Sequence, residues 1–389
     1  MKQQVAKLIY VWLVRIFSLL YKRLAVRNRL TYLMSFTNNE NGLLKTFMEQ
    51  NSDIEIVIFY TKNCNKEAEK FQSLGATIFL FDQSPVLIKK VISEMIQSRV
   101  ILCDNYFPIL SGFFPHKETS IIQLWHANGA IKCFGLEDPS TMSRSFFDRL
   151  RFKQVYKRFD EYIVGSKMMG KVFQRSYLAT EDKMLYLGFP RSDVYFDKNS
   201  LDSKKEKIYK KFPELTNKKI ILYAPTYREN NSNFFVLDIK RMYAELGNSY
   251  ALLIKKHPHD VQLYKSEEFS GFVYDDITEF KMEEILAITD CLVTDYSSIP
   301  FEYSLLENAG KIIFYCYDQK YYSETTGIQK DFENWAPGDI VHTIDELLKS
   351  INKKNNINFA KFNEQWNTYN DGNAKSRVIQ HIENKFNEF

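Results

Sequence analysis

Short runs of apolar residues recur along the chain from residue 30 onward, separated by longer polar or amphipathic stretches. Most of these runs are β-branched or aromatic and apolar throughout, which is typical of strands covered on both faces and hence of parallel sheets with crossover helices. The predicted strands of a first series are Leu30–Phe36, Ile54–Tyr60, Ala76–Phe81, Val100–Asp104, Ile121–Trp125, Tyr162–Gly165 and Met184–Phe189. Those of a second series are Ile220–Ala224, Ala251–Lys255, Phe272–Tyr274, Cys291–Thr294 and Lys311–Tyr317.

The two series predict two domains. A polar, Lys-rich stretch, Asp193–Asn217, separates them and is expected to be a linker or a linker with a short helix. A length of 389 residues also fits two domains better than one. We expect an α/β fold of two Rossmann-like, doubly wound domains facing a cleft, at residues 30–200 and 201–357, followed by a helical tail at 358–389.

Residues 1–29 form a basic N-terminal segment with seven Lys or Arg residues, and the first acidic residue is Glu40. The apolar stretch VAKLIYVWLVRIFSLLY is interrupted by Lys7 and Arg15, which favours a basic amphipathic helix on a membrane surface over a spanning helix. No small-residue cleavage site follows it, which argues against a cleaved signal peptide. The alternative is an amphipathic helix packed on the protein's own core.

Composition excludes several function classes. The formal net charge of +4 is too small to predict nucleic-acid binding. Five scattered Cys with no CxxC pair argue against a disulfide scaffold and a structural zinc site. Neither a P-loop, a GxGxxG fingerprint nor a GxSxG elbow is present, which disfavours Walker-type NTPases, dinucleotide oxidoreductases and α/β-hydrolases. With no DxD motif either, we expect no cofactor and no metal requirement.

Two histidines at strand ends are the candidate catalytic residues. Ligands of open α/β sheets bind beyond the carboxyl ends of the strands, so polar residues there are the first candidates for a site. His126, in WHANG (125–129), has the pKa class of a general base near neutral pH. His257, in KKHPHD (255–260), is expected to contact phosphate rather than a metal. The alternative for His126 is a hydrogen-bonded structural histidine, and the alternative for His257 is a metal ligand.

The other candidates lie in strand-end motifs that could hold an anion. GFPRSD contains an Arg that could bind phosphate bidentately, and TDYSSIPFE places a helix start with free N–H groups after a strand. A surface Arg and a plain helix cap are the alternatives. The predicted substrate-binding residues are Trp125, Asn128, Gly129, Arg191, Pro225, Thr226, Arg228, Thr294, Asp295, Ser297, Ser298 and Glu302.

Together, WHANG, GFPRSD, APTYR, KKHP and TDYSSIPFE resemble the CDP-glycerol glycerophosphotransferase family of wall teichoic acid synthesis, over nearly the whole chain after residue 30. Within the family, the short length, ILCDNYF (101–107) and WHANGAIKCFGLED look most like the glycerol-phosphate primases. Family polymerases typically carry WHGTPLK, where this chain has Ala127-Asn128 before Gly129.

The resemblance implies a GT-B architecture, CDP-glycerol as donor and ManNAc-GlcNAc on undecaprenyl diphosphate as acceptor. It also implies a peripheral position on the cytoplasmic face of the cell membrane, where other teichoic acid enzymes are possible partners. In the family, the histidines matching His126 and His257 are regarded as essential. The alternatives are a poly(glycerol phosphate) polymerase or CDP-ribitol transferase of the same family, and a GT-B glycosyltransferase that uses a nucleotide sugar.

Overall fold

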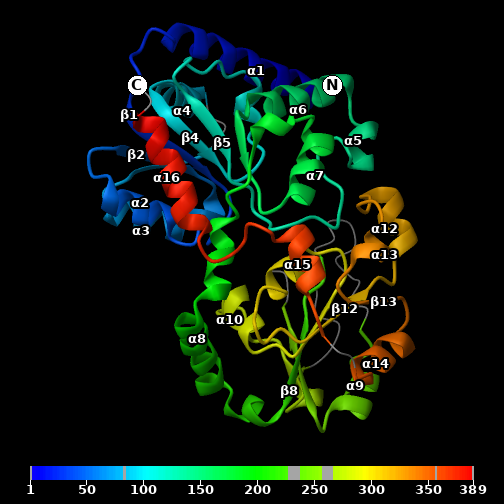
Figure 1. The fold of residues 1–389 in the computed structure, drawn as a ribbon. Helices are drawn as coiled ribbons and strands as arrows, with labels where there is room; N and C mark the ends of the chain where they lie inside the picture. Colours follow the sequence, from blue (N-terminus) through cyan, green and yellow to red (C-terminus); the bar gives the residue numbers. More distant parts are fainter. Residues whose placement is uncertain (1, 82–84, 227–236, 256–265, 355–356, 388–389) are drawn as a thin grey trace. The chain divides into compact units, whose positions relative to one another are not determined.

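The computed structural model describes residues 2–81, 85–226, 237–255, 266–354 and 357–387, which form two compact units (Figure 1). Unit 1 comprises Met1–Asn128, Phe134–Asp193 and Thr368–Phe389, and unit 2 comprises Gly129–Cys133 and Val194–Asn367. The chain therefore passes from unit 1 to unit 2 directly after the predicted WHAN motif.

Unit 1 is built on a sheet of seven parallel strands in the order β3-β2-β1-β4-β5-β6-β7. Its strands are β1 (Arg27–Met34), β2 (Glu55–Tyr60), β3 (Thr77–Leu80), β4 (Ser98–Cys103), β5 (Ser120–Gln123), β6 (Glu161–Ile163) and β7 (Met184–Leu185). The order reverses between β1 and β4, as in a Rossmann fold, and this switch point is where such sheets bind ligands.

Unit 2 repeats the same topology with six parallel strands in the order β10-β9-β8-β11-β12-β13. The strands are β8 (Lys219–Tyr223), β9 (Tyr250–Ile254), β10 (Val273–Tyr274), β11 (Cys291–Thr294), β12 (Lys311–Tyr315) and β13 (Asp339–Val341). Its switch point lies between β8 and β11. Both sheets have apolar side chains on both faces, as the uninterrupted apolar runs predict.

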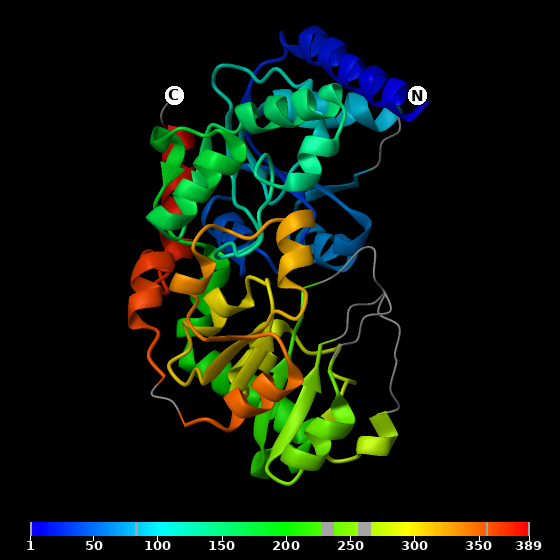
Figure 2. The same ribbon diagram turned by 90° about the vertical axis from the view of Figure 1, so that its right-hand side faces the viewer.

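Helices cover the two sheets (Figures 1 and 2). Those of unit 1 are α1 (Lys2–Tyr21), α2 (Leu43–Gln50), α3 (Asn65–Ser73), α4 (Pro85–Ile96), α5 (Pro139–Ser143), α6 (Phe146–Arg158), α7 (Lys167–Tyr177) and α16 (Ala374–Asn387). Those of unit 2 are α8 (Lys198–Lys211), α9 (Ile239–Leu246), α10 (Met282–Ala287), α11 (Ile299–Tyr303), α12 (Gln319–Thr325), α13 (Phe332–Trp335), α14 (Ile344–Asn352) and α15 (Ala360–Trp366).

The structure confirms the α/β class and the two Rossmann-like sheets, and it differs from the predicted elements in several places. The expected linker is mostly the helix α8, because Leu201 and Ile208 bury one face of an otherwise charged segment. The units divide at Asp193/Val194 rather than near residue 200. The expected tail is split: α15 belongs to unit 2, and α16 to unit 1.

The N-terminal helix α1 exposes several large apolar side chains to solvent. Ile9 is 52% exposed and Trp12 60% exposed, whereas Val14 and Ser18 are buried. The Ser18 hydroxyl donates to the main-chain carbonyl of Phe114 at 3.1 Å, so a narrow inner face holds the helix to unit 1.

Arg29 is not part of a solvent-facing basic segment. It lies in β1 and is buried, with ion pairs to Glu55 at 2.7 Å and to Glu94. Its charge is therefore neutralised inside unit 1, and the exposed cations that follow α1 are Lys22, Arg23 and Arg27.

Candidate active site

His126 lies beyond the carboxyl end of β5, beside the switch point of unit 1. The residue before it, Trp125, has a φ of 60°, a left-handed backbone that a bulky side chain rarely adopts. The Gln123 side chain accepts from the Trp125 N–H at 3.0 Å and stabilises this turn. The turn ends the strand abruptly and carries the imidazole out of the sheet.

The His126 ring is oriented by residues that follow β1 and β4. Its Nδ1 lies 2.8 Å from the main-chain carbonyl of Asp104. The Phe36 ring stacks on it, with centroids 3.9 Å apart and planes 12° apart, and the Trp125 ring lies at 4.2 Å. Because a carbonyl only accepts hydrogen bonds, Nδ1 carries the proton of the neutral ring, and Nε2 is the basic nitrogen.

Arg191 and Asn39 hold the backbone of the same turn. Arg191 Nη1 donates to the His126 carbonyl and, at 3.1 Å, to the Asn39 side chain. Asn39 in turn donates to the Trp125 carbonyl at 2.6 Å. Arg191, predicted as a phosphate contact, thus lies next to His126, with one of its nitrogens engaged in positioning this turn.

Asn128 is fully buried, and neither atom of its side-chain amide has a hydrogen-bond partner among the described residues. The Trp125 Nε1 likewise has none in that part of the chain. Buried polar atoms are normally paired, so this turn offers two groups that could hydrogen-bond a ligand or a water molecule.

Gly129, the other predicted contact in this motif, has a packing role in unit 2. A Cβ at this position would lie 2.4 Å from the Phe301 ring, so only glycine fits. The segment continues into unit 2, where Gln329 N–H donates to the Ile131 carbonyl at 2.7 Å.

Asp295 is the central polar residue at the switch point of unit 2. It follows β11 and is buried, and its Oδ1 accepts from the Thr226 N–H at 2.7 Å, the Thr226 hydroxyl at 2.6 Å and the Tyr296 N–H at 2.6 Å. The carboxylate thereby ties the loop after β8, with the half-buried Pro225, to the loop after β11.

Of the remaining residues of TDYSSIPFE, some are buried and hydrogen-bond to neighbouring segments, and others are partly exposed. The buried Thr294 hydroxyl donates to the Ala224 carbonyl at 2.7 Å, and buried Glu302 accepts from the Tyr195 hydroxyl at 2.9 Å. Ser297 and Ser298 are partly exposed at the start of α11, which begins where the sequence predicts. The Ser297 hydroxyl accepts from the Ile299 N–H at 3.3 Å. The helix has only five residues, so its dipole contributes little.

Two of the predicted residues, His257 and Arg228, lie outside the described residues. Their roles stay predictions. Within the described ranges, the structure contains no group of three or more His, Cys, Asp or Glu residues placed to hold a metal ion.

The sequence interpretation missed the residues that hold His126 from other strands: Asn39, Ser35, Phe36 and Asp104. The Asp104 carboxylate is buried and accepts from the Ser35 N–H at 2.7 Å and the Phe36 N–H at 2.8 Å. Burial raises the pKa of Asp104 to about 6, against the opposing effect of these donors. A signal was available, because Asp104 directly follows the apolar run VILC, in the same strand-end position as Asp295.

Comparisons with known proteins identify the family of the chain. The family model described as CDP-Glycerol:Poly(glycerophosphate) glycerophosphotransferase matches residues 17–384. A teichoic acid glycerol-phosphate primase of Bacillus subtilis is 34% identical over 92% of both chains. A second one, from Bacillus spizizenii, is 32% identical over 97% of this chain and 98% of its own.

Solved structures show the same fold. A structure of the wall teichoic acid polymerase TagF superimposes with a TM-score of 0.77 at 18% identity, covering 100% of this chain and 98% of that one. At this identity the likeness concerns the fold alone, and the family follows from the sequence matches. The chain therefore belongs to the CDP-glycerol:poly(glycerophosphate) glycerophosphotransferase family and is a transferase of teichoic acid biosynthesis.

Proposed function

We propose that this enzyme is a glycerol-phosphate primase. It transfers glycerol phosphate from CDP-glycerol to the ManNAc of undecaprenyl-diphosphate-linked ManNAc-GlcNAc and releases CMP. The observation that carries the proposal is the match over more than nine tenths of both chains to relatives named glycerol-phosphate primases. The His126 turn at the switch point supports it, because a basic nitrogen stands where Rossmann-like sheets bind their ligands.

In this mechanism the acceptor's sugar hydroxyl attacks the β-phosphorus of CDP-glycerol. A bond forms between the sugar oxygen and phosphorus, the bond between that phosphorus and the bridging oxygen breaks, and CMP leaves. His126 Nε2 takes the hydroxyl proton. Positioning and charge stabilisation dominate phosphoryl transfer, and we assign them to His257, Arg228 and the loop carrying Ser297 and Ser298. These cationic and N–H donors would suffice without a divalent metal.

Donor choice tests the proposal. The purified enzyme is given the lipid-linked disaccharide with CDP-glycerol, CDP-ribitol or a UDP-sugar, in the presence of a chelator. We expect CMP release coupled to acceptor modification with CDP-glycerol and at least tenfold lower kcat/KM with the other donors, because a diphosphate site built for one alcohol leaves polar groups unpaired with another. A UDP-sugar as the best donor would replace this function with a glycosyltransferase, and CDP-ribitol would make it a ribitol-phosphate transferase.

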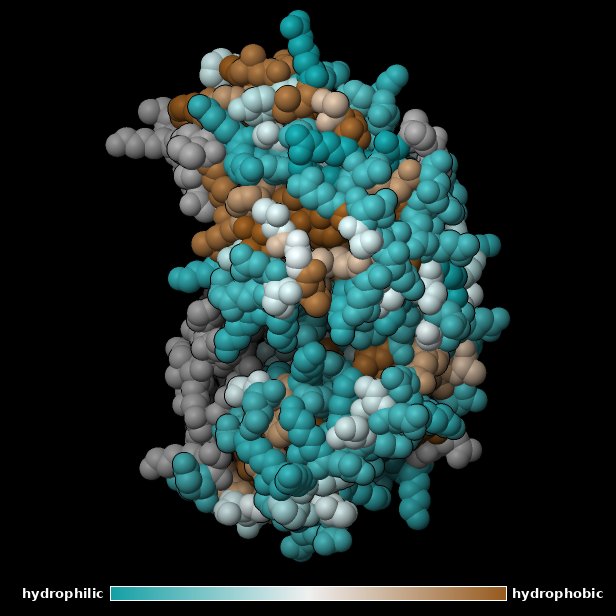
Figure 3. Space-filling model, turned by 90° about the vertical axis from the view of Figure 1, so that its left-hand side faces the viewer, coloured by the Kyte–Doolittle hydropathy of each residue, from teal (hydrophilic) through white to brown (hydrophobic). Residues whose placement is uncertain are grey.

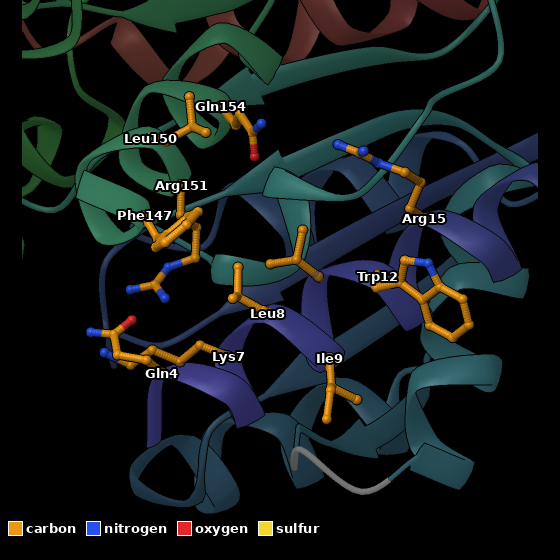
Figure 4. Close-up of a pocket in the computed structure, with 11 residues that line it drawn as sticks. Gln4, Lys7, Leu8, Ile9, Trp12, Arg15, Phe147, Leu150, Arg151 and Gln154 are labelled. Atoms are coloured by element: carbon orange, nitrogen blue, oxygen red, sulfur yellow. The ribbon is translucent and has the colours of Figure 1, made fainter. Parts of the chain in front are cut away.

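We also propose that α1 attaches the enzyme to the cytoplasmic face of the cell membrane. Residues 4–21 form a helix that is long and apolar enough to span a membrane. Signal sequences and buried core helices have the same length and composition. The distribution of apolar side chains supports attachment to the membrane surface. Residues of α1 and α6 line a groove of about 560 Å³, and Leu8, Trp12 and Leu150 are among them (Figure 4). These three side chains are exposed to solvent. Apolar side chains also gather on the surface around α1 (Figure 3).

Charged substitutions on the outer face of α1 test this attachment. The double variant Ile9→Glu/Trp12→Glu is expected to lower the partition coefficient onto vesicles containing anionic lipid by at least tenfold, because each side chain contributes about 1.5–3 kcal/mol when buried. Vesicle sedimentation measures it. The control is Leu74→Glu, which changes a side chain that is 44% exposed on unit 1 but away from α1. Equal binding by both variants would contradict attachment through α1.

A further inference from the structure

The imidazole of His126 is held by a neighbour that takes no part in the proposed chemistry. Asp104, the residue after β4, offers its main-chain carbonyl to His126 Nδ1 at 2.8 Å. Its side chain points to the loop after β1, which contains Phe36, the residue stacked on the same imidazole. Asp104 thus contacts His126 directly through its main-chain carbonyl. It also acts on His126 indirectly, through the loop that carries Phe36.

The Asp104 carboxylate accepts hydrogen bonds from three polar groups of the Ser35–Phe36 corner. Oδ2 accepts from the Ser35 N–H at 2.7 Å and the Phe36 N–H at 2.8 Å, and Oδ1 accepts from the Ser35 hydroxyl at 2.8 Å. The Tyr32 hydroxyl adds a longer contact at 3.4 Å. Since the Asp104 side chain is fully buried, water cannot take the place of these donors, and the three bonds hold the corner against the carboxylate.

The corner carries the Phe36 ring, whose centroid lies 3.9 Å from that of the imidazole, so the position of the corner determines where the stacking ring lies. A ring held by a hydrogen bond at Nδ1 alone could still rotate about that bond. A face-stacked aromatic ring removes this freedom, because the two rings lie within 12° of parallel.

We propose that Asp104 is a positioning residue for His126, acting through its own carbonyl, which selects the tautomer, and through Phe36, which sets the ring plane. The proposal rests on the proposed function, in which His126 Nε2 is the general base. Asp104 itself touches neither substrate nor the reacting atoms.

The test compares Asp104→Ala with Asp104→Asn in the full-length enzyme. Alanine releases the Ser35–Phe36 corner, whereas asparagine keeps an oxygen for the two N–H donors and turns its NH₂ to the Ser35 hydroxyl, which can accept. We expect Asp104→Ala to lower kcat by roughly 10- to 100-fold with KM for CDP-glycerol within twofold, since small misplacements of a catalytic group cost this much. Asp104→Asn should restore most of kcat.

The control for simple loss of stability is Asp160→Ala. The Asp160 side chain accepts from the Ile121 N–H at 2.9 Å. This bond lies at the amino ends of β5 and β6, whereas His126 lies beyond the carboxyl end of β5. We expect Asp160→Ala to lower the melting temperature without changing kcat per folded molecule. A kcat of Asp104→Ala that equals that of Asp160→Ala, or an Asp104→Asn variant as impaired as Asp104→Ala, would overturn the proposal.

A spectroscopic readout separates this proposal from the proposed function. With ¹⁵N-labelled histidine, the chain has six imidazoles to resolve, and His126→Asn assigns the signal. We expect the Nδ1–H tautomer for His126 in the wild-type protein. If the wild type fails to use CDP-glycerol but shows this tautomer, the function is wrong and the positioning stands. If it transfers glycerol phosphate with the Nε2–H tautomer, the positioning is wrong.

Discussion

Replacing His126 by alanine is expected to lower kcat by about 10²- to 10⁴-fold, the usual contribution of a general base. The dissociation constant for CDP-glycerol should stay within about threefold, because in this mechanism the base acts on the acceptor hydroxyl. The imidazole hydrogen-bonds to Asp104, stacks on Phe36 and lies at the switch point of unit 1. Rapid-quench measurement of CMP release gives kcat, and calorimetry gives donor affinity.

Two further variants separate base catalysis from loss of structure. His126→Asn retains a donor toward the Asp104 carbonyl but cannot take up a proton, so it should be as inactive as His126→Ala while melting closer to the wild type. His116→Ala removes another half-buried histidine of unit 1 and should leave kcat unchanged. Turnover near the wild-type rate in His126→Asn would remove the base assignment.

The second large effect is expected at Asp295. Asp295→Ala leaves three donors without their acceptor: the N–H and hydroxyl of Thr226 and the N–H of Tyr296. A buried donor left without an acceptor costs about 1–3 kcal/mol; the Tyr296 N–H is buried and the two Thr226 donors are partly buried, so the free energy of unfolding should fall by about 1–3 kcal/mol. Because the Thr226 loop is no longer held, we also expect CDP-glycerol affinity to fall at least tenfold. Urea denaturation and calorimetry measure the two effects.

Asp295→Asn is the matched control, since its amide oxygen can accept the same three bonds. It should keep most of the stability and lose less affinity than the alanine variant. If both variants bind CDP-glycerol as the wild type does, the loops after β8 and β11 do not form the donor site.

Most strands could be predicted because they are short apolar runs, and the central strands are buried on both faces. The strand β13 was not predicted, because it has only three residues, one of them an Asp, and so forms no apolar run. Likewise, the sequence predicts only a linker or a linker with a short helix where α8 lies, because Leu201 and Ile208 alone mark its buried face among many charges.

The site could be predicted only where its residues follow a strand within one motif. His126 and Asp295, which the structure places directly beyond strand ends, are candidates identified in this way. Asn39 and Phe36 were not, because they act on the His126 turn from the loop after β1, and only the strand order β1-β4-β5 brings that loop within reach of the turn after β5. Arg29 was predicted wrongly from its neighbours in sequence. It lies in the basic segment expected at the membrane surface, whereas in the structure its ion pairs with Glu55 and Glu94 hold it in the sheet of unit 1.

The number of glycerol phosphates added to one acceptor tests the central claim most directly. The enzyme is incubated with the undecaprenyl-diphosphate-linked disaccharide and excess CDP-glycerol to completion, and the products are resolved by mass spectrometry. A primase predicts one product, the acceptor plus a single glycerol phosphate, with one CMP released per acceptor. A ladder of products that lengthens with the donor-to-acceptor ratio, or an acceptor left unmodified, would contradict the account.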